Sequence, residues 1–147
     1  MMIETQPLEP LDRAALPARV AALAKEGWRL VQICCSCRDA YEVTYSFDRE
    51  GRFLNLRIGF SKEDPALPSI TESYFGAFAY ENEMQDLFGL RLDGLKLNFH
   101  GNFYRLAKKN PFLDPPAAGS PGASPAASPS APSAEGAPRA APDPRPT

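Results

Sequence analysis

The feature that most constrains the fold is a sharp change of composition near residue 113. Residues 114–147 are almost entirely Ala, Pro, Ser and Gly, and they include no aromatic residue and no Leu, Ile or Val. Such a segment cannot bury enough apolar surface to offset the entropy lost on ordering, so we predict a disordered tail over residues 114–147. The folded unit is predicted to cover residues 1–113, the length of one small domain.

The folded unit has the pattern of an α+β domain. Residues 16–27 have one apolar helical face, with Pro17 near the start and Gly27 at the end, which predicts a helix. Three strand-like runs follow at residues 28–37, 41–47 and 53–60; the first is apolar on both faces, and the other two alternate apolar and polar residues. Short turn-forming segments join them, so we predict an antiparallel sheet of three or more strands with helices packed on it.

A second helix is predicted in AYENEMQDLFGL, residues 79–90. Tyr80, Met84, Leu87 and Phe88 form one apolar stripe, which we expect to pack on the sheet. Gly89 is placed to end the helix in a left-handed conformation.

Three carboxylates, Glu81, Glu83 and Asp86, lie on the rest of this helix. Glu83 and Asp86 are three residues apart and repel each other, and Asp86 lies in the last turn, where the helix macrodipole disfavours negative charge. We therefore expect a compensating cation, either on another subunit or within this chain. The candidates within the chain are Arg57, Arg91, Lys96 and Arg105. General acid–base catalysis and a solvated acidic face are the other two interpretations.

The cysteines and the histidine give weaker signals. Cys35 and Cys37 should share one face of a strand and Cys34 the other, so the three thiolates cannot converge on one metal ion. We expect them to be small buried apolar side chains, and we expect no cofactor, metal site or catalytic residue in this chain. A Cys-based redox or metal-binding protein stays open as an alternative. His100 is the only histidine, and a loop or packing role is favoured for it.

Charge and hydropathy bear on location. No uncharged stretch in the folded unit is longer than eight residues, the length of residues 30–37, which is far short of the roughly 20 needed to cross a bilayer. The first ten residues lack the basic-then-apolar order of a signal peptide, so we expect a cytoplasmic chain. The formal net charge of −2 gives no reason to expect nucleic-acid binding.

Residues 68–90, PSITESYFGAFAYENEMQDLFGL, resemble the signature of the C-type (30 kDa) subunit of respiratory complex I. In that signature a PSLT segment precedes an acidic E-x-E-x-x-D-L-F-G helix. The motif positions here are Glu81, Glu83, Asp86, Leu87, Phe88 and Gly89. The resemblance covers about residues 14–113 and implies an α+β domain like that of the complex I 30 kDa subunit.

The sequence also departs from the complex I pattern. Complex I members continue with a Gly-His-Pro element, whereas Asp93, Gly94 and Leu95 follow here, and Phe75 stands where a proline is usual. The short ENEM-x-DLFG form followed by GNFYR is more similar to the short counterpart subunit, the D-type subunit, of Ech-type energy-converting [NiFe] hydrogenases.

The resemblance implies a non-catalytic structural subunit of a membrane-bound hydrogenase that couples ferredoxin-linked hydrogen evolution to ion translocation. The expected partners are the large and small hydrogenase-type subunits, which would hold the [NiFe] centre and the iron–sulfur clusters. The chain would lie peripherally on the cytoplasmic side of the inner membrane, attached through integral membrane subunits, with no small-molecule substrate. The expected docking surface is the second helix with residues 91–112, and Phe103, Tyr104 and Arg105 are residue types expected at interface anchors.

Three other functions stay open. The first alternative is the C-type subunit of an NADH-quinone oxidoreductase. The others are the Cys-based redox protein and a free-standing carboxylate enzyme.

Overall fold

The computed structural model describes residues 6–113. The predicted disordered tail, residues 114–147, lies outside the described residues. Strands, helices and two 3-10 turns follow one another as β1 (Leu8–Pro10), η1 (Arg13–Ala15), α1 (Leu16–Lys25), β2 (Arg29–Cys37), β3 (Tyr41–Arg49), β4 (Arg52–Phe60), β5 (Ala66–Pro68), η2 (Phe75–Ala77), α2 (Phe78–Phe88) and β6 (Arg91–Asp93). The fold is α+β, as predicted.

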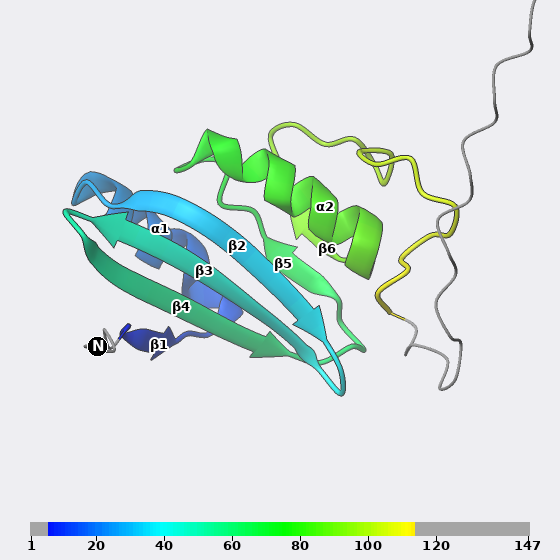
Figure 1. Ribbon diagram of the computed structural model, residues 1–147, viewed down its shortest axis with the longest axis horizontal. Helices are drawn as coiled ribbons and strands as arrows, with labels where there is room; N and C mark the ends of the chain where they lie inside the picture. The colour runs from blue at the N-terminus through cyan, green and yellow to red at the C-terminus, as the bar shows by residue number, and fades with distance from the viewer. Residues whose placement is uncertain (1–5, 114–147) are drawn as a thin grey trace, which may run out of the picture. The chain divides into compact units, whose positions relative to one another are not determined.

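The three predicted strands form the antiparallel meander β2–β3–β4 (Figure 1). At its centre, Tyr45 of β3 lies opposite Ile33 of β2 and Leu56 of β4. The short strand β1 adds to β4 in parallel, so the sheet is mixed and its order is β1-β4-β3-β2. β1 was not predicted, because three residues are too few to show a period.

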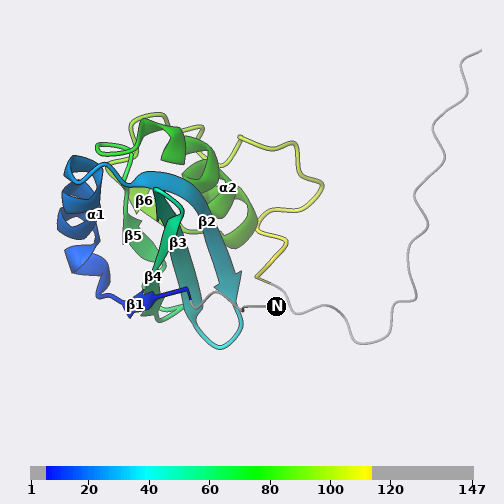
Figure 2. The same cartoon turned by 60° about the vertical axis from the view of Figure 1, so that its left-hand side comes forward.

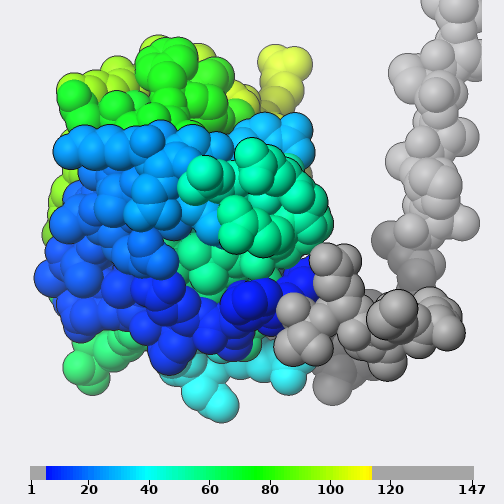
Figure 3. Space-filling model, turned by 90° about the vertical axis from the view of Figure 1, so that its left-hand side faces the viewer, coloured from blue at the N-terminus to red at the C-terminus, as the bar shows by residue number. Residues whose placement is uncertain are grey.

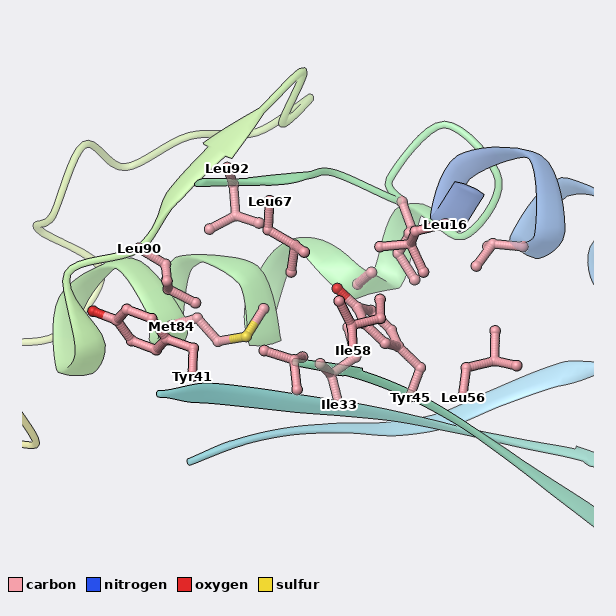
Figure 4. Packing of buried hydrophobic residues seen from close by; sticks show 14 of the residues in the cluster. Leu16, Ile33, Tyr41, Tyr45, Leu56, Ile58, Leu67, Met84, Leu90 and Leu92 are labelled. Atoms are coloured by element: carbon pink, nitrogen blue, oxygen red, sulfur yellow. The ribbon is translucent and has the colours of Figure 1, made fainter. Parts of the chain in front are cut away.

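One face of the sheet carries the core, and the alternation in β3 explains why. Tyr41, Val43, Tyr45 and Phe47 are all at most 3% exposed, and they point to the same side because side chains alternate along a strand. Figure 4 shows Tyr41 and Tyr45 between the strands and the layer made by α2, β5 and β6. The burial of this apolar face is the main force that holds the layers together.

Both helices cover this same face (Figures 1 and 2). α1 contributes Leu16, Val20 and Leu23 to the core, and Gly27 follows it with a φ of +81°, as expected for a residue that closes a helix in the left-handed conformation. The two-stranded parallel pair β5–β6 lies beside α2. β5 and β6 are only three residues long. β5 falls in a stretch whose prolines and polar residues indicate a loop, and β6 in residues 91–112, whose pattern indicates an irregular or strand-like segment.

The edge strand β2 differs from its prediction. It was expected to be apolar on both faces, yet Ile33 is the one residue of β2 that is buried. The sheet order puts β2 at an edge, and the face opposite the core carries the polar side chains of Gln32, Thr44 and Arg57, which line a shallow hollow with Cys34. Cys34 was expected to be buried, and this is wrong because Cys34 is exposed. Cys35 and Cys37 lie on the other face of β2 and pack partly buried against the core.

No helix in the described part of the chain combines the length and the apolar character needed to span a bilayer. The space-filling view in Figure 3 shows α2 (green) along one edge of the described unit, with β2 (light blue) next to it and β1 (dark blue) farther away. The polar residues of α2 and the segment beyond β6 belong to that edge.

Candidate functional site

The first carboxylate of α2, Glu81, is completely buried. Its Oε2 accepts a hydrogen bond from the Ser69 hydroxyl at 2.6 Å, and its Oε1 accepts one from the backbone N–H of Ile70 at 2.8 Å. Desolvation by burial raises the pKa of Glu81, and the two hydrogen bonds lower it in part. Glu81 therefore fixes the turn after β5 to the first half of α2.

This carboxylate ends a short chain of hydrogen bonds. The Thr71 Oγ1 lies 2.6 Å from Ser69 Oγ, and it accepts the backbone N–H of Lys96 at 3.1 Å. Because Ser69 donates its proton to Glu81, Thr71 must be the donor to Ser69. The PSIT segment and the glutamate twelve residues later are thus one structural device, which joins β5, α2 and the start of the segment after β6.

Asn82, next to Glu81, is also fully buried. Its side-chain nitrogen donates to the carbonyl oxygens of Phe78 (2.7 Å) and Leu97 (2.8 Å), and its oxygen accepts the backbone N–H of Phe99 at 2.8 Å. All three bonds have ordinary lengths. We call residues 94–113 the flanking segment; it follows β6 and runs beside α2 (Figure 1). Asn82 holds this segment against the helix at Leu97 and Phe99.

The other two carboxylates hold the flanking segment at a single residue, Tyr104. Asp86, which is 3% exposed, accepts the backbone N–H of Tyr104 at 2.6 Å, and Glu83 accepts its phenol O–H, also at 2.6 Å. The hydrogen bond to Glu83 raises the pKa of the Tyr104 hydroxyl. The second oxygen of Asp86, Oδ1, is buried without a hydrogen-bond partner in the described chain.

The expectation of a compensating cation within the chain is wrong. Across residues 6–113, no ion pair is recorded for the three carboxylates of α2. Arg57, Arg91 and Lys96 instead pair with Glu42, Asp93 and Glu72, respectively. The physical reason is that the carboxylates accept N–H and O–H groups, and charge-assisted hydrogen bonds of this kind stabilise an anion without a formal counter-charge.

The prediction for the helix stripe was correct in part. Met84 and Phe88 are buried in the core, and Tyr80 and Leu87 pack against it partly buried. A solvated acidic face was one interpretation of the polar side, but three of its residues, Glu81, Asn82 and Asp86, are buried. The flanking segment covers that side, and a helical period alone cannot show a covering layer made by an irregular segment.

The end of α2 is fixed by Gly89, as predicted. Its φ is +67°, and its N–H donates to the carbonyl of Gln85 at 3.0 Å. A Cβ at this position would lie 3.1 Å from Cγ of Asn110, whose amide nitrogen is placed to donate to the carbonyls of Gln85 and Asp86 at 3.2 Å. The glycine is thus required by the backbone conformation and by the close approach of the flanking segment. Nearby, Leu87 accepts the N–H of Phe112 at 3.1 Å.

The flanking segment groups three aromatic side chains beside α2. Phe103 contacts both Phe99 and Tyr104, with ring centroids 5.3 and 5.0 Å apart. Phe99 and Tyr104 are 41% and 42% exposed, and Arg105 beside them is exposed as well. The structure therefore brings Phe103, Tyr104 and Arg105 together with Glu83 and Asp86 but leaves Glu81 below the surface.

The remaining candidates lie elsewhere. Burial raises the pKa of the Cys35 thiol to about 12, and the neighbouring thiols add to the shift, which leaves the thiolate scarce near neutral pH. Within residues 6–113, no group of three or more His, Cys, Asp or Glu side chains is placed to hold a metal ion. His100 is exposed in the flanking segment, with a φ of +52°.

Sequence reasoning missed three side chains that build this site: Ser69, Thr71 and Asn82. Ser69 and Thr71 lie in the PSIT element, so their fixed distance from Glu81 was the available signal. Asn82 lies outside the apolar stripe of the helix, and no role was predicted for it. Its signal was weaker, because a buried amide is recognised only when its backbone partners are known.

Comparison with known proteins shows the family of the chain. A family model described as "Respiratory-chain NADH dehydrogenase, 30 Kd subunit" matches residues 11–100. The C/D subunit of the NADH-quinone oxidoreductase of Methylococcus capsulatus is 41% identical over 70 residues, which are 46% of this chain and 11% of that protein. The chain thus spans about a tenth of the length of this curated relative.

Two solved structures share the fold. The trypsin-resistant fragment (1–134) of Nqo5 has a TM-score of 0.54 at 24% identity, over 61% of this chain and 80% of that one. A chain of the membrane-bound sulfane sulfur reductase, an archaeal respiratory membrane complex, has a TM-score of 0.58 at 14% identity, over 67% of this chain and 64% of that one. At these identities the likeness concerns the fold alone.

Proposed function

Since the chain belongs to the family of the 30 kDa subunit of respiratory-chain NADH dehydrogenase, we propose that it is a non-catalytic structural subunit of a membrane-bound energy-converting [NiFe] hydrogenase. In this complex, reduced ferredoxin drives hydrogen evolution, which is coupled to ion translocation. The [NiFe] centre and the iron–sulfur clusters belong to the large and small partner subunits. The chain docks the large subunit on the cytoplasmic side of the cell membrane, and integral membrane subunits hold it there indirectly.

The observation that supports a docking role is the use that the chain makes of its carboxylates. Glu81 and Asp86 are 0% and 3% exposed, so neither can meet a substrate without rearrangement. Together with Glu83 they accept donors from the chain itself and fix Tyr104. A helix whose acidic groups position an aromatic segment is suited to present a surface to a partner, not to move protons.

The motif residues divide into two roles in this proposal. Phe103, Tyr104 and Arg105 contact the partner, because Tyr104 and Arg105 are exposed, Phe103 packs against Tyr104, and all three are types that often anchor interfaces. The motif of α2 acts behind them and holds the segment in place. It comprises Glu81, Glu83, Asp86, Leu87, Phe88 and Gly89.

The choice of a hydrogenase comes from the sequence. The short ENEM-x-DLFG helix and the GNFYR element after it resemble the D-type subunit of Ech hydrogenases more than complex I members. The second candidate is the C-type subunit of an NADH-quinone oxidoreductase, and the 41% identity to a C/D subunit over 70 residues favours it.

Purification of the complex separates the two candidates. The full chain is tagged in its own organism, the complex is extracted with mild detergent, and the co-purifying subunits are identified. A hydrogenase large subunit, with hydrogen evolution from reduced ferredoxin, is the expected result. NADH-dependent quinone reduction without hydrogen evolution would establish the second candidate instead, and turnover by the pure chain alone would contradict a non-catalytic role.

A further inference from the structure

The flanking segment carries basic residues but no acidic ones. Residues 94–113 contain no Asp and no Glu, whereas Lys96, Arg105, Lys108 and Lys109 are basic. The chain as a whole has a formal net charge of −2, so this segment differs in sign from the rest. Its outer surface is positive because the carboxylates of α2 lie behind it and are largely covered.

The positive groups at the far end of the segment are exposed. Arg105 and Lys109 are both solvent-exposed, and none of the ion pairs of residues 6–113 involves either of them. The backbone N–H groups of Arg105, Leu106 and Ala107 also have no hydrogen-bond partner in the described chain. Cationic side chains and free N–H donors thus lie next to one another, which is the arrangement that receives a carboxylate.

The same residues border a hollow. It measures about 720 Å³ and lies between the end of α2 and the loop of residues 100–110, with Gln85 and Asp86 on the helix side. Tyr104, Leu106 and Lys109 line the loop side, and the first two are 42% and 37% exposed. Figure 2 shows this stretch (yellow) leaving α2 and returning to it.

We propose that this hollow docks an acidic segment of a partner polypeptide, with a carboxylate between Arg105 and Lys109 and an apolar side chain against Tyr104 and Leu106. The inference rests on the proposed function for the existence of a partner protein, and it specifies the chemistry of that partner. It reverses the initial expectation of a basic partner surface, because two of the three carboxylates are buried and used within the chain.

A polypeptide fits this surface better than an anionic membrane does. The hollow is bordered by irregular backbone with free N–H groups, and such groups are costly to bury in lipid, where nothing accepts their hydrogen bonds. A partner polypeptide supplies carbonyl and carboxylate acceptors. Charge attraction alone would not distinguish the two surfaces, so both enter the test.

The first test uses a zero-length carbodiimide, which joins an amine to a carboxylate in contact with it. In the purified complex, Lys109 is expected to be linked to an Asp or Glu of a partner protein within an acidic stretch. The matched control is Lys109→Arg, which keeps the charge but removes the amine. The double variant Lys108→Arg/Lys109→Arg shows whether a remaining cross-link comes from the amine of the neighbouring Lys108. A link from Lys109 to this chain's own carboxylates, or no link to a partner, would overturn the proposal.

The second test reverses the charge. Arg105→Glu/Lys109→Glu is expected to weaken retention of the partner by about tenfold at low salt, with a smaller effect at high salt. The control pair Arg38→Glu/Lys62→Glu changes the net charge equally at two exposed residues of distant turns, and it should leave retention unchanged. Equal retention in both double variants would refute an acidic occupant.

Vesicle flotation tests whether this surface binds an anionic membrane instead of a polypeptide. The full chain is mixed with vesicles of phosphatidylcholine and phosphatidylserine, and little binding is expected. Binding that the Arg105→Glu/Lys109→Glu change abolishes, with partner retention intact, would assign the surface to lipid and overturn the proposal. If the complex co-purifies normally in that variant, the proposed function stands while this inference fails.

Discussion

Replacement of Glu81 by Gln tests the buried carboxylate that joins β5 to α2. The side chain is 0% exposed and accepts hydrogen bonds from the Ser69 hydroxyl and the Ile70 N–H. A Gln keeps one acceptor oxygen and turns an NH₂ group toward the other donor. The lost hydrogen bond, and the buried donor that it leaves unsatisfied, should together lower the free energy of unfolding by about 2–4 kcal/mol at acidic pH.

The pH dependence of this loss has a definite sign. Burial raises the pKa of Glu81 above its ordinary value of 4.5, so the folded state binds its proton more tightly than the unfolded state does. Its contribution is fully present below pH 4.5 and is lost as the pH rises through the raised pKa. Gln does not titrate, so the stability difference between wild type and Glu81→Gln should shrink as the pH rises above 4.5 and through the raised pKa of Glu81.

Urea denaturation of both proteins across this pH range measures the difference, because groups that titrate equally in both proteins cancel. The control is Glu63→Gln, which changes an exposed carboxylate and should alter stability by less than about 0.5 kcal/mol. A stability difference that grows with pH would show that Glu81 is stabilised as an anion, and it would refute the reasoning from burial.

Three further predictions concern single side chains. Asn82→Ala removes the side-chain hydrogen bonds to Phe78, Leu97 and Phe99 and should cost about 2–3 kcal/mol of stability. Hydrogen exchange should be faster at the Phe99 N–H, and unchanged exchange there would contradict the role of Asn82 in holding the flanking segment. Tyr45→Phe should leave the stability unchanged or raise it by up to about 1 kcal/mol, because the buried hydroxyl has no hydrogen-bond partner in the described chain. A clearly lower melting temperature of the variant would contradict this and would show that the hydroxyl has a partner. Iodoacetamide near neutral pH should label exposed Cys34 well before Cys35, whose thiol pKa is about 12, and mass spectrometry that found Cys35 labelled first would contradict this order.

The sequence was sufficient for the elements that carry a regular period. The alternation of Tyr41, Val43, Tyr45 and Phe47 predicted both the strand and its buried face, and Gly89 predicted the end of α2. These features depend on residues close to one another in the chain. Strands β1, β5 and β6 have three residues each, and they exist because of pairing with distant segments, which no local pattern records.

The environment of the carboxylates could not be predicted for the same reason. A helical wheel places Glu81 and Asp86 on the polar side, and that placement is correct. What covers this side is the flanking segment, which has no period and is held by side-chain hydrogen bonds such as those of Asn82 to Leu97 and Phe99. The signature motif indicated that the residues belong together, but not that hydrogen-bond donors would take the place of cations.

The measurement that tests the central claim most directly is the turnover of the assembled complex carrying Glu83→Gln and Asp86→Asn. These changes weaken the bonds that hold Tyr104 while nearly preserving side-chain size. If the α2 carboxylates position a docking segment, less complex should assemble, and hydrogen evolution per assembled complex should stay at the wild-type level. Normal assembly with lost turnover would mean that these carboxylates take part in the chemistry, and it would contradict the account.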